Sequence, residues 1–245
     1  MNFLKRAVVA GALAGATLLT SGCASRTPVP RERVVFDGVK VFHARPADRG
    51  KAIELARELA LVNSVIPEGA KVRVARVRSN PQGIVPFSGS LSWTGVPNQY
   101  YVTANNVFKH GLHRQTAFHE ACHALFERTR VLRSDESFEH WRFWVHSPVS
   151  REDNYRLFDE SNYVPRSSPY WGHPSDSASE TFASGATVMR FWPKGFLREM
   201  RRLKRKSPET YEHALHVSRE ITHAFGLRRK EFFNPKLLAY LRNGR

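Results

Sequence analysis

The chain has 245 residues, of which hydrophobic residues make up 41% and charged residues 24%. This balance is typical of a globular protein and excludes a disordered chain or one embedded throughout in a membrane. The formal charge of +16 favours an anionic partner surface, and 2 cysteines exclude a disulfide framework.

Residues 1–23 have the organisation of an export signal. A basic start precedes an apolar run over residues 7–19, which is too short to span a membrane comfortably. The following Thr20-Ser21-Gly22-Cys23 is similar to the lipobox of bacterial lipoproteins, although Thr20 stands where that pattern prefers Leu. We therefore expect a lipoprotein signal peptide lipidated at Cys23 and a tether over 24–33. An ordinary cleaved signal peptide is the alternative.

The lipoprotein interpretation implies where the protein is located and which partners it contacts. Ala24, rather than Asp, follows the cysteine, which in a Gram-negative bacterium indicates the outer membrane, facing the periplasm. We expect membrane attachment through the N-terminal lipid and contact with an anionic envelope surface, whereas nucleic acid is an unlikely partner in that compartment. The densest basic run, 198–206, is expected to be a solvated helix face.

Residues 34–245 are expected to form a single domain. Alternating patterns predict strands at 34–42, 71–78 and 99–104, with a short strand at 91–94 inside a turn-rich connection. Apolar residues at helical spacing predict helices at 49–62, 115–130, 177–191, 194–206, 208–225 and 235–241. The aromatic stretch 133–174 predicts short helices and loops over a cleft. Because the strands come early and the helices late, the fold class is α+β.

The helix predicted at 115–130 contains an H-E-x-x-H motif, His119-Glu120-Ala121-Cys122-His123. Residues four apart in a helix lie on one face, so the two histidines can converge on one ion while Glu120 reaches a water beside it. Zinc lowers the pKa of such a water to about 7, and a carboxylate can take its proton. The motif therefore predicts a catalytic Zn²⁺ site with Glu120 as the general base.

A catalytic zinc commonly has three protein ligands and one open position. We expect the third ligand to be Glu180, in the first turn of the helix predicted at 177–191. Ser177 and Glu180 also fit the S-x-x-E capping box, in which Glu180 would instead bond a backbone N–H at the start of the helix. The rival ligands are His140, His146, His173 and Asp176.

The H-E-x-x-H motif followed by Glu180-Thr181-Phe182-Ala183 resembles the gluzincin branch of the zincin metallopeptidases. The E-x-F-A form is similar to that of the anthrax lethal factor-like peptidases. The resemblance covers two helices, 115–130 and 177–191. It implies a zincin-like fold, with a small N-terminal mixed or antiparallel sheet, an active-site helix and a mostly helical C-terminal lobe. It also implies that an edge strand, here 99–104, binds the substrate backbone.

The same resemblance implies roles for individual residues. His119, His123 and Glu180 would bind zinc, and Glu120 would be the base. In that group a tyrosine upstream of the ligand glutamate can stabilise the oxyanion. Here His173 stands seven residues before Glu180 and Tyr170 is the nearest preceding tyrosine, so both are candidates.

These residues predict a zinc metallopeptidase that acts on a protein or peptide substrate in the cell envelope. Two alternatives stay open: a non-catalytic envelope lipoprotein that uses the scaffold for binding or assembly, and a zinc amidase that acts on cell-wall peptides. The presence of Glu120 favours a catalyst. Specificity depends on cleft loops, so the sequence does not separate the peptidase from the amidase.

Three further features have structural explanations that we favour over functional ones. Cys122 is expected to be a small buried side chain rather than a fourth ligand. His213, His216 and His223 are expected to be polar residues of an amphipathic helix rather than a second site. The aromatic residues of 133–174 are expected to pack over the cleft rather than bind a glycan.

Overall fold

The computed structural model describes residues 32–43, 45–78, 88–93, 100–105, 107–128, 135–164 and 174–244. The expected signal peptide with Cys23 lies outside these residues, as do Tyr170 and His173. The first strand begins at Glu32, so it already includes the last two residues expected for the tether. Within the described ranges, none of the helices combines the length and the apolar character that a membrane crossing needs.

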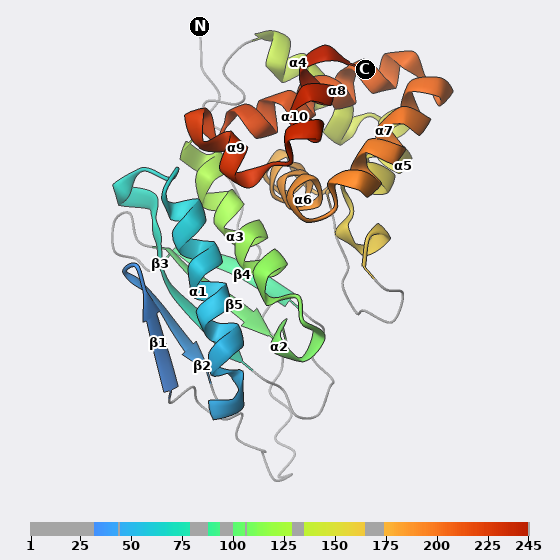
Figure 1. Cartoon of the computed structure of the whole chain (residues 1–245). Coiled ribbons are helices and arrows are strands. Elements are labelled where there is room, and N and C mark those ends of the chain that lie inside the picture. Colours follow the sequence, from blue (N-terminus) through green and yellow to red (C-terminus); the bar gives the residue numbers. More distant parts are fainter. Residues whose placement is uncertain are drawn as a thin grey trace, which may run out of the picture.

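The protein has a mixed α+β fold, with a small sheet and a larger helical part (Figure 1). The described strands are β1 (Glu32–Phe36), β2 (Val39–His43), β3 (Val72–Arg78), β4 (Ser88–Trp93) and β5 (Tyr100–Asn105). They form one sheet in the order β1-β2-β3-β5-β4. β3 runs parallel to β2 and β5, whereas the pairs β1–β2 and β4–β5 are antiparallel. The sheet is therefore mixed.

The prediction of a single strand over 34–42 was wrong, because the chain reverses direction in the middle of this stretch. Asp37 and Gly38 have φ angles of 44° and 74°, and Phe36 pairs with Val39 across the turn. Two consecutive residues with positive φ give the tight turn that suits the twist of a two-stranded hairpin, and Asp-Gly is a favoured pair for it. The stretch therefore forms the hairpin β1–β2 at one edge of the sheet.

The prediction that 99–104 is an edge strand was also wrong. This stretch is β5, and β5 pairs with β3 on one side and with β4 on the other. The edge beyond β5 belongs to β4, which forms from the turn-rich connection in which only a short strand at 91–94 was predicted. A strand rich in Ser and Gly carries little alternation, so its pattern is weak.

Two long helices pack side by side on one face of the sheet (Figure 1). Helix α1 (Arg49–Asn63) contacts β1 and β2, and α3 (His113–Arg128) contacts β4 and β5. Leu55 and Leu59 of α1 are completely buried, as is Phe118 of α3, whose ring lies 5.9 Å from that of Phe225 in the helical part. The short helix α2 (Val107–His110) precedes α3. The active-site helix predicted at 115–130 is thus confirmed as a helix, shifted by two residues.

The C-terminal part of the chain is helical. It contains α4 (Asp135–His146), α5 (Pro148–Phe158), α6 (Ala178–Phe191), α7 (Pro193–Lys206), α8 (Pro208–His223), α9 (Arg229–Phe232) and α10 (Pro235–Asn243). Short 3₁₀ turns occur at Pro46–Asp48, Glu68–Ala70, Glu160–Asn162 and Gly226–Arg228. The mostly helical C-terminal lobe is therefore confirmed.

Within the aromatic stretch 133–174, the described residues 135–164 are more regular than predicted. Helices α4 and α5 follow each other there, joined at Ser147, whose side chain caps α5. Trp141, Trp144 and Phe158 are buried, and the rings of Trp144 and Phe158 meet edge to face at 5.7 Å. These aromatic residues build the core of the helical part, which agrees with packing rather than glycan binding.

Candidate metal centre

Helix α3 brings His119 and His123 onto one face. They lie one turn apart, and their Nε2 atoms are 3.3 Å from each other. The rings are nearly perpendicular, with an interplanar angle of 73°. His119 is buried and His123 half-buried, because α6 packs across this face of α3.

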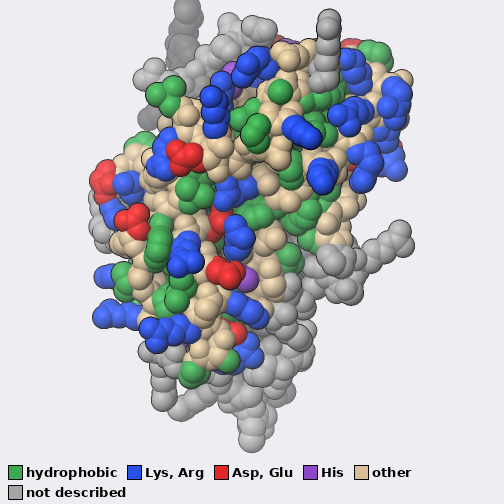
Figure 2. All heavy atoms as spheres, in the orientation of Figure 1, with side chains coloured by type: hydrophobic (Ala, Val, Ile, Leu, Met, Phe, Trp, Pro, Cys, Tyr) green, Lys and Arg blue, Asp and Glu red, His purple; other side chains and the backbone are tan. Residues whose placement is uncertain are grey.

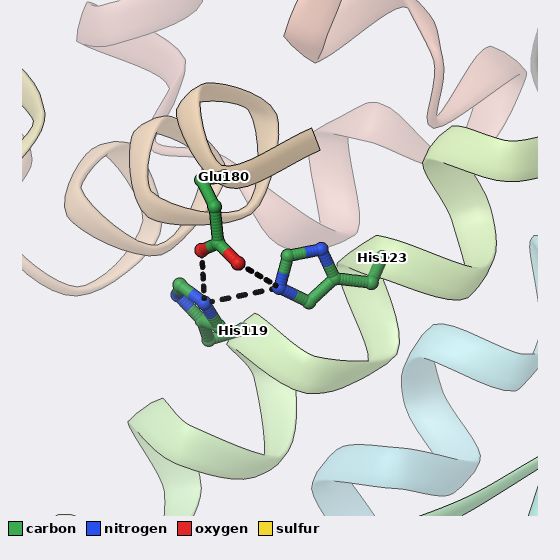
Figure 3. A group of neighbouring side chains, drawn as sticks. All are labelled: His119, His123 and Glu180. Carbon is green, nitrogen blue, oxygen red and sulfur yellow. Dashed lines mark hydrogen bonds and ion pairs between the residues drawn. The ribbon is translucent and has the colours of Figure 1, made fainter. Parts of the chain in front are cut away.

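Helix α6 supplies a carboxylate to the same point (Figure 3). Glu180 Oε2 lies 3.4 Å from Nε2 of His119, and Oε1 lies 3.6 Å from Nε2 of His123. Ser177 is the N-cap of α6, and its Oγ accepts the backbone N–H of Glu180. The cap fixes the first turn of the helix, while the Glu180 carboxylate faces the two histidines. Among the described residues, these three form the group that could hold a metal ion.

The other ring nitrogen of each histidine has its own hydrogen-bond partner. His119 Nδ1 is 2.8 Å from Glu160 Oε1, and His123 Nδ1 is 2.7 Å from Ser179 Oγ. If each Nδ1 carries the proton and donates it to its partner, Nε2 presents a lone pair to the ion. Sequence reasoning missed both partners. Ser179 directly precedes Glu180, but nothing in the local pattern marks Glu160, which lies 41 positions from His119.

The charges around His119 act on its protonation. Burial alone lowers the pKa of His119, but the charge and hydrogen bond of Glu160 outweigh it, together with Glu180 and Glu120, so the pKa is raised well above the usual value. Glu120 is itself buried on α3, next to His119 in the chain. This acidic environment favours the doubly protonated, cationic imidazole, and a cation at Nε2 would compete with the proton on that atom.

The rival third ligands that the structure describes do not join this group. Asp176 and His146 are exposed, and His140 lies against α8, where its Nδ1 is 2.9 Å from Nδ1 of His213. His173 and the oxyanion candidate Tyr170 lie outside the described residues.

Cys122 and the histidines of α8 also stand apart from the centre. Cys122 is a free, completely buried thiol whose pKa burial raises well above its usual value, as expected for a packing residue. His213 and His216 are half-buried against α4, with the ring of His216 stacked on His140 at 4.0 Å. His223 is exposed near the end of α8.

Comparison of the whole chain with known proteins gives no match to a protein-family model, a curated protein or a solved structure. The chemistry of the group formed by His119, His123 and Glu180 is therefore argued from its own geometry.

Proposed function

We propose that the chain is a zinc-dependent peptidase of the cell envelope, with His119, His123 and Glu180 as zinc ligands and Glu120 as the general base. The observation that carries the proposal is the convergence of three ligand side chains from two helices. The Nε2 atoms of His119 and His123 are 3.3 Å apart, and each lies near a different oxygen of Glu180, Oε2 at 3.4 Å from His119 and Oε1 at 3.6 Å from His123. Beside them lies a buried carboxylate that belongs to the H-E-x-x-H motif.

The spacing and the donor types both favour zinc. In a tetrahedral site with metal–ligand distances of about 2.0–2.1 Å, the ligand atoms stand roughly 3.3–3.4 Å apart. The 3.3 Å between the two Nε2 atoms and the 3.4 Å between Nε2 of His119 and Oε2 of Glu180 are close to that value, so the side chains need little movement to receive the ion. Two imidazoles and one carboxylate form the ligand set of catalytic zinc sites that keep a fourth position open.

Different residues of the chain would have different roles in hydrolysis. Zinc, when bound, lowers the pKa of a water to about 7 and polarises the scissile carbonyl. Glu160 and Ser179 hold the two imidazoles in the orientation that turns Nε2 towards the ion. Glu120 accepts a proton from the attacking water and delivers it to the leaving amine, which makes it the acid and base of the reaction.

The edge of the sheet suggests where an extended substrate lies. β4 pairs with β5 on one side only among the described strands, and it packs beside α3, the helix that carries the two histidines. A peptide that adds to β4 as a further strand would gain backbone hydrogen bonds and run along the active-site helix. This assignment replaces 99–104 by β4 as the candidate substrate strand.

The test combines metal content with activity. The purified full chain, Glu180→Ala and Glu120→Gln are each assayed for bound zinc and for casein cleavage, with the exposed Glu152→Gln on α5 as the control. We expect about one zinc in the wild type, loss of zinc in Glu180→Ala, and retained zinc without cleavage in Glu120→Gln.

Each outcome of this test has a clear meaning. A wild type without zinc would refute the metal assignment and with it the peptidase. Zinc that persists in Glu180→Ala would move the third ligand elsewhere, with His173 the next candidate. Bound zinc without cleavage of casein would favour one of the two alternatives, the non-catalytic binding protein or the cell-wall amidase.

A further inference from the structure

A pocket of about 460 Å³ lies in the helical part of the molecule, outside the candidate metal centre. Its walls come from the end of α8, from α9 and from α10. The lining residues are Arg219, Thr222, His223, Arg229, Lys230, Pro235, Leu238, Ala239, Leu241 and Arg242. Four of these side chains are permanently cationic, one is a histidine, and none is a carboxylate. Figure 2 shows that Lys and Arg side chains gather over the helical part of this face.

Arg219 is built into the pocket wall. Its Nε donates to the carbonyl of Leu241 at 2.6 Å, and its Nη2 donates to the carbonyl of Arg242 at 3.4 Å. These carbonyls belong to the last turn of α10, where a cation is favoured by the helix dipole. The guanidinium is therefore held in place before any ligand arrives.

The other cations of the pocket are not neutralised by acidic side chains. Within the described part of the chain, no carboxylate lies within ion-pair distance of Arg229, Lys230 or Arg242. The nearby Glu231 forms its ion pair with Arg228 instead, at 2.5 Å. The pocket therefore presents an excess of positive charge.

The pKa of His223 responds to this charge. Although the side chain is largely exposed, its pKa is lowered, first by partial burial of the ring and then by the positive charge of Arg229, with Arg219 adding to the effect and Glu220 opposing it. An anion bound in the pocket would act in the opposite direction and raise the pKa of His223. The histidine thus offers a local reporter of occupancy.

The pocket lining also contains apolar side chains. They are Pro235, Leu238, Ala239 and Leu241, all from α10. A lining that combines cationic and apolar side chains suits a ligand that carries both an anionic group and a hydrocarbon part. A phosphoryl group matches the cations better than a single carboxylate, because its three oxygens and double charge can engage two arginines and a lysine together.

We propose that the pocket between α8, α9 and α10 binds the phosphoryl group of an anionic amphiphile, with the adjoining apolar part of the ligand resting on α10. The ligand could reach the pocket from a phospholipid bilayer or as a soluble phosphorylated amphiphile. The site is independent of the metal centre and shares no residue with it.

The experiment uses the full chain with Cys23→Ser, so that no lipid of its own contributes. Binding is measured by calorimetry to dodecyl phosphate below its micelle concentration, to inorganic phosphate, and to vesicles of phosphatidylcholine with and without phosphatidylglycerol. Two variants disturb the pocket: R229Q/K230Q removes two of the lining cations, and Ala239→Glu places a carboxylate at an exposed position of the apolar lining. R198Q/R205Q on α7 is the control, because it removes the same charge from exposed positions.

We expect dodecyl phosphate to bind more tightly than inorganic phosphate, and each pocket variant to weaken it by roughly tenfold or more. The control should lose little. Additional binding to phosphatidylglycerol vesicles that depends on the pocket would identify a bilayer as the source; binding of dodecyl phosphate alone would identify a soluble amphiphile. Equal affinity for inorganic phosphate, an equal loss in R198Q/R205Q, or no binding in any arm would overturn the proposal.

Discussion

At the scale of single residues, the candidate centre depends on how each histidine is held. The Nδ1 atoms of His119 and His123 are bonded to Glu160 and Ser179, which turns both Nε2 atoms towards Glu180. Glu160 is completely buried. A buried carboxylate is costly unless it is paired, so its contact with His119 stabilises both groups.

This arrangement predicts the effect of Glu160→Gln. The amide keeps the size of the side chain and can still accept the Nδ1 proton, but it loses the charge that makes the imidazole a stronger ligand. Zinc affinity, measured by competition with a chelating dye, should fall by about tenfold or more.

Glu152→Gln, on the exposed side of α5, is the matched control and should bind zinc as the wild type does. Equal affinities in the two variants would show that Glu160 does not support the ligand.

From helix geometry the sequence predicted that the two histidines share a face with Glu120 beside them. It offered Glu180 through the first turn of a second predicted helix, and the resemblance of the E-x-F-A motif pointed to the same residue. It did not predict Glu160, whose relation to His119 depends on how the 3₁₀ turn after α5 folds back onto α3. Such long-range contacts have no local signature. The same reason explains why Ser177 was recognised as a possible cap and Ser179 was not recognised as a partner of His123.

At the scale of elements, the position of α6 depends on close packing around Gly185. A Cβ atom at this position would lie 2.8 Å from Cδ1 of Ile221 on α8 and 3.1 Å from the ring of Phe158 on α5. Both side chains are buried. Gly185 thus lets three helices approach one another behind the turn that carries Glu180.

Gly185→Ala should therefore destabilise the protein, although alanine normally favours a helix. The gain in helix propensity is about 1 kcal/mol, whereas overpacking a core costs roughly 1–3 kcal/mol, so a net loss of about 1 kcal/mol is expected. Urea unfolding followed by circular dichroism measures the change. Gly50→Ala in α1, where a Cβ atom would meet nothing within 4 Å, should be neutral or stabilising; a loss of stability there would contradict the argument.

The contact between α4 and α8 should respond to pH. The pKa of His213 is lowered, first by burial and then by His140, with His216 contributing and Glu209 opposing. A depressed histidine pKa means that the unfolded chain binds the proton more readily than the folded one. The contribution of neutral His213 to the free energy of unfolding is therefore fully present above the unfolded pKa of about 6.5. It is lost as the pH falls towards the folded pKa.

His213→Gln tests this effect, because it removes the titrating group from the interface. Unfolding free energies measured from pH 7.5 to 5.0 should fall less steeply in the variant than in the wild type. Parallel curves would show that His213 does not titrate against folding.

Most helices were predicted to within a few residues because their apolar periodicity is strong. The errors concern the sheet. The hairpin at Asp37-Gly38 was overlooked inside an alternating run, and the order of the strands depends on pairings between distant segments. Alternation indicates that a segment is a strand, but it does not indicate which neighbour it pairs with.

At the scale of the whole molecule, α3 connects the sheet to the helical part. It packs on α1, β4 and β5 on one side and on α6 on the other, and the candidate ligands lie across its contact with α6. The buried Glu58 of α1 adds a second connection through its ion pair with Arg190 of α6, at 2.5 Å. A cation held between α3 and α6 would therefore bind only the folded arrangement.

Binding of this kind predicts a stabilisation by zinc. At a free concentration of about 100 times the dissociation constant, the free energy of unfolding should rise by about 2.7 kcal/mol, which corresponds to roughly 5–10 °C in Tm for a chain of this size. Calorimetric scans with zinc and with a chelator measure the shift. Glu180→Ala should show no difference between the two conditions; a full shift in that variant would place the stabilising ion elsewhere.

The distance along the chain between the two ligand helices gives the ion a further role. The ligand His123 on α3 and Ser179, which precedes the ligand Glu180 on α6, are 56 positions apart, and α4 and α5 lie within that loop. Closing a loop of this length with a cross-link restricts the unfolded chain by about 4 kcal/mol. The described part of the chain contains a single cysteine, Cys122, so it has no covalent link of this kind. The ion would then act as a reversible cross-link. Its loss would loosen the α4–α5 segment before the sheet unfolds.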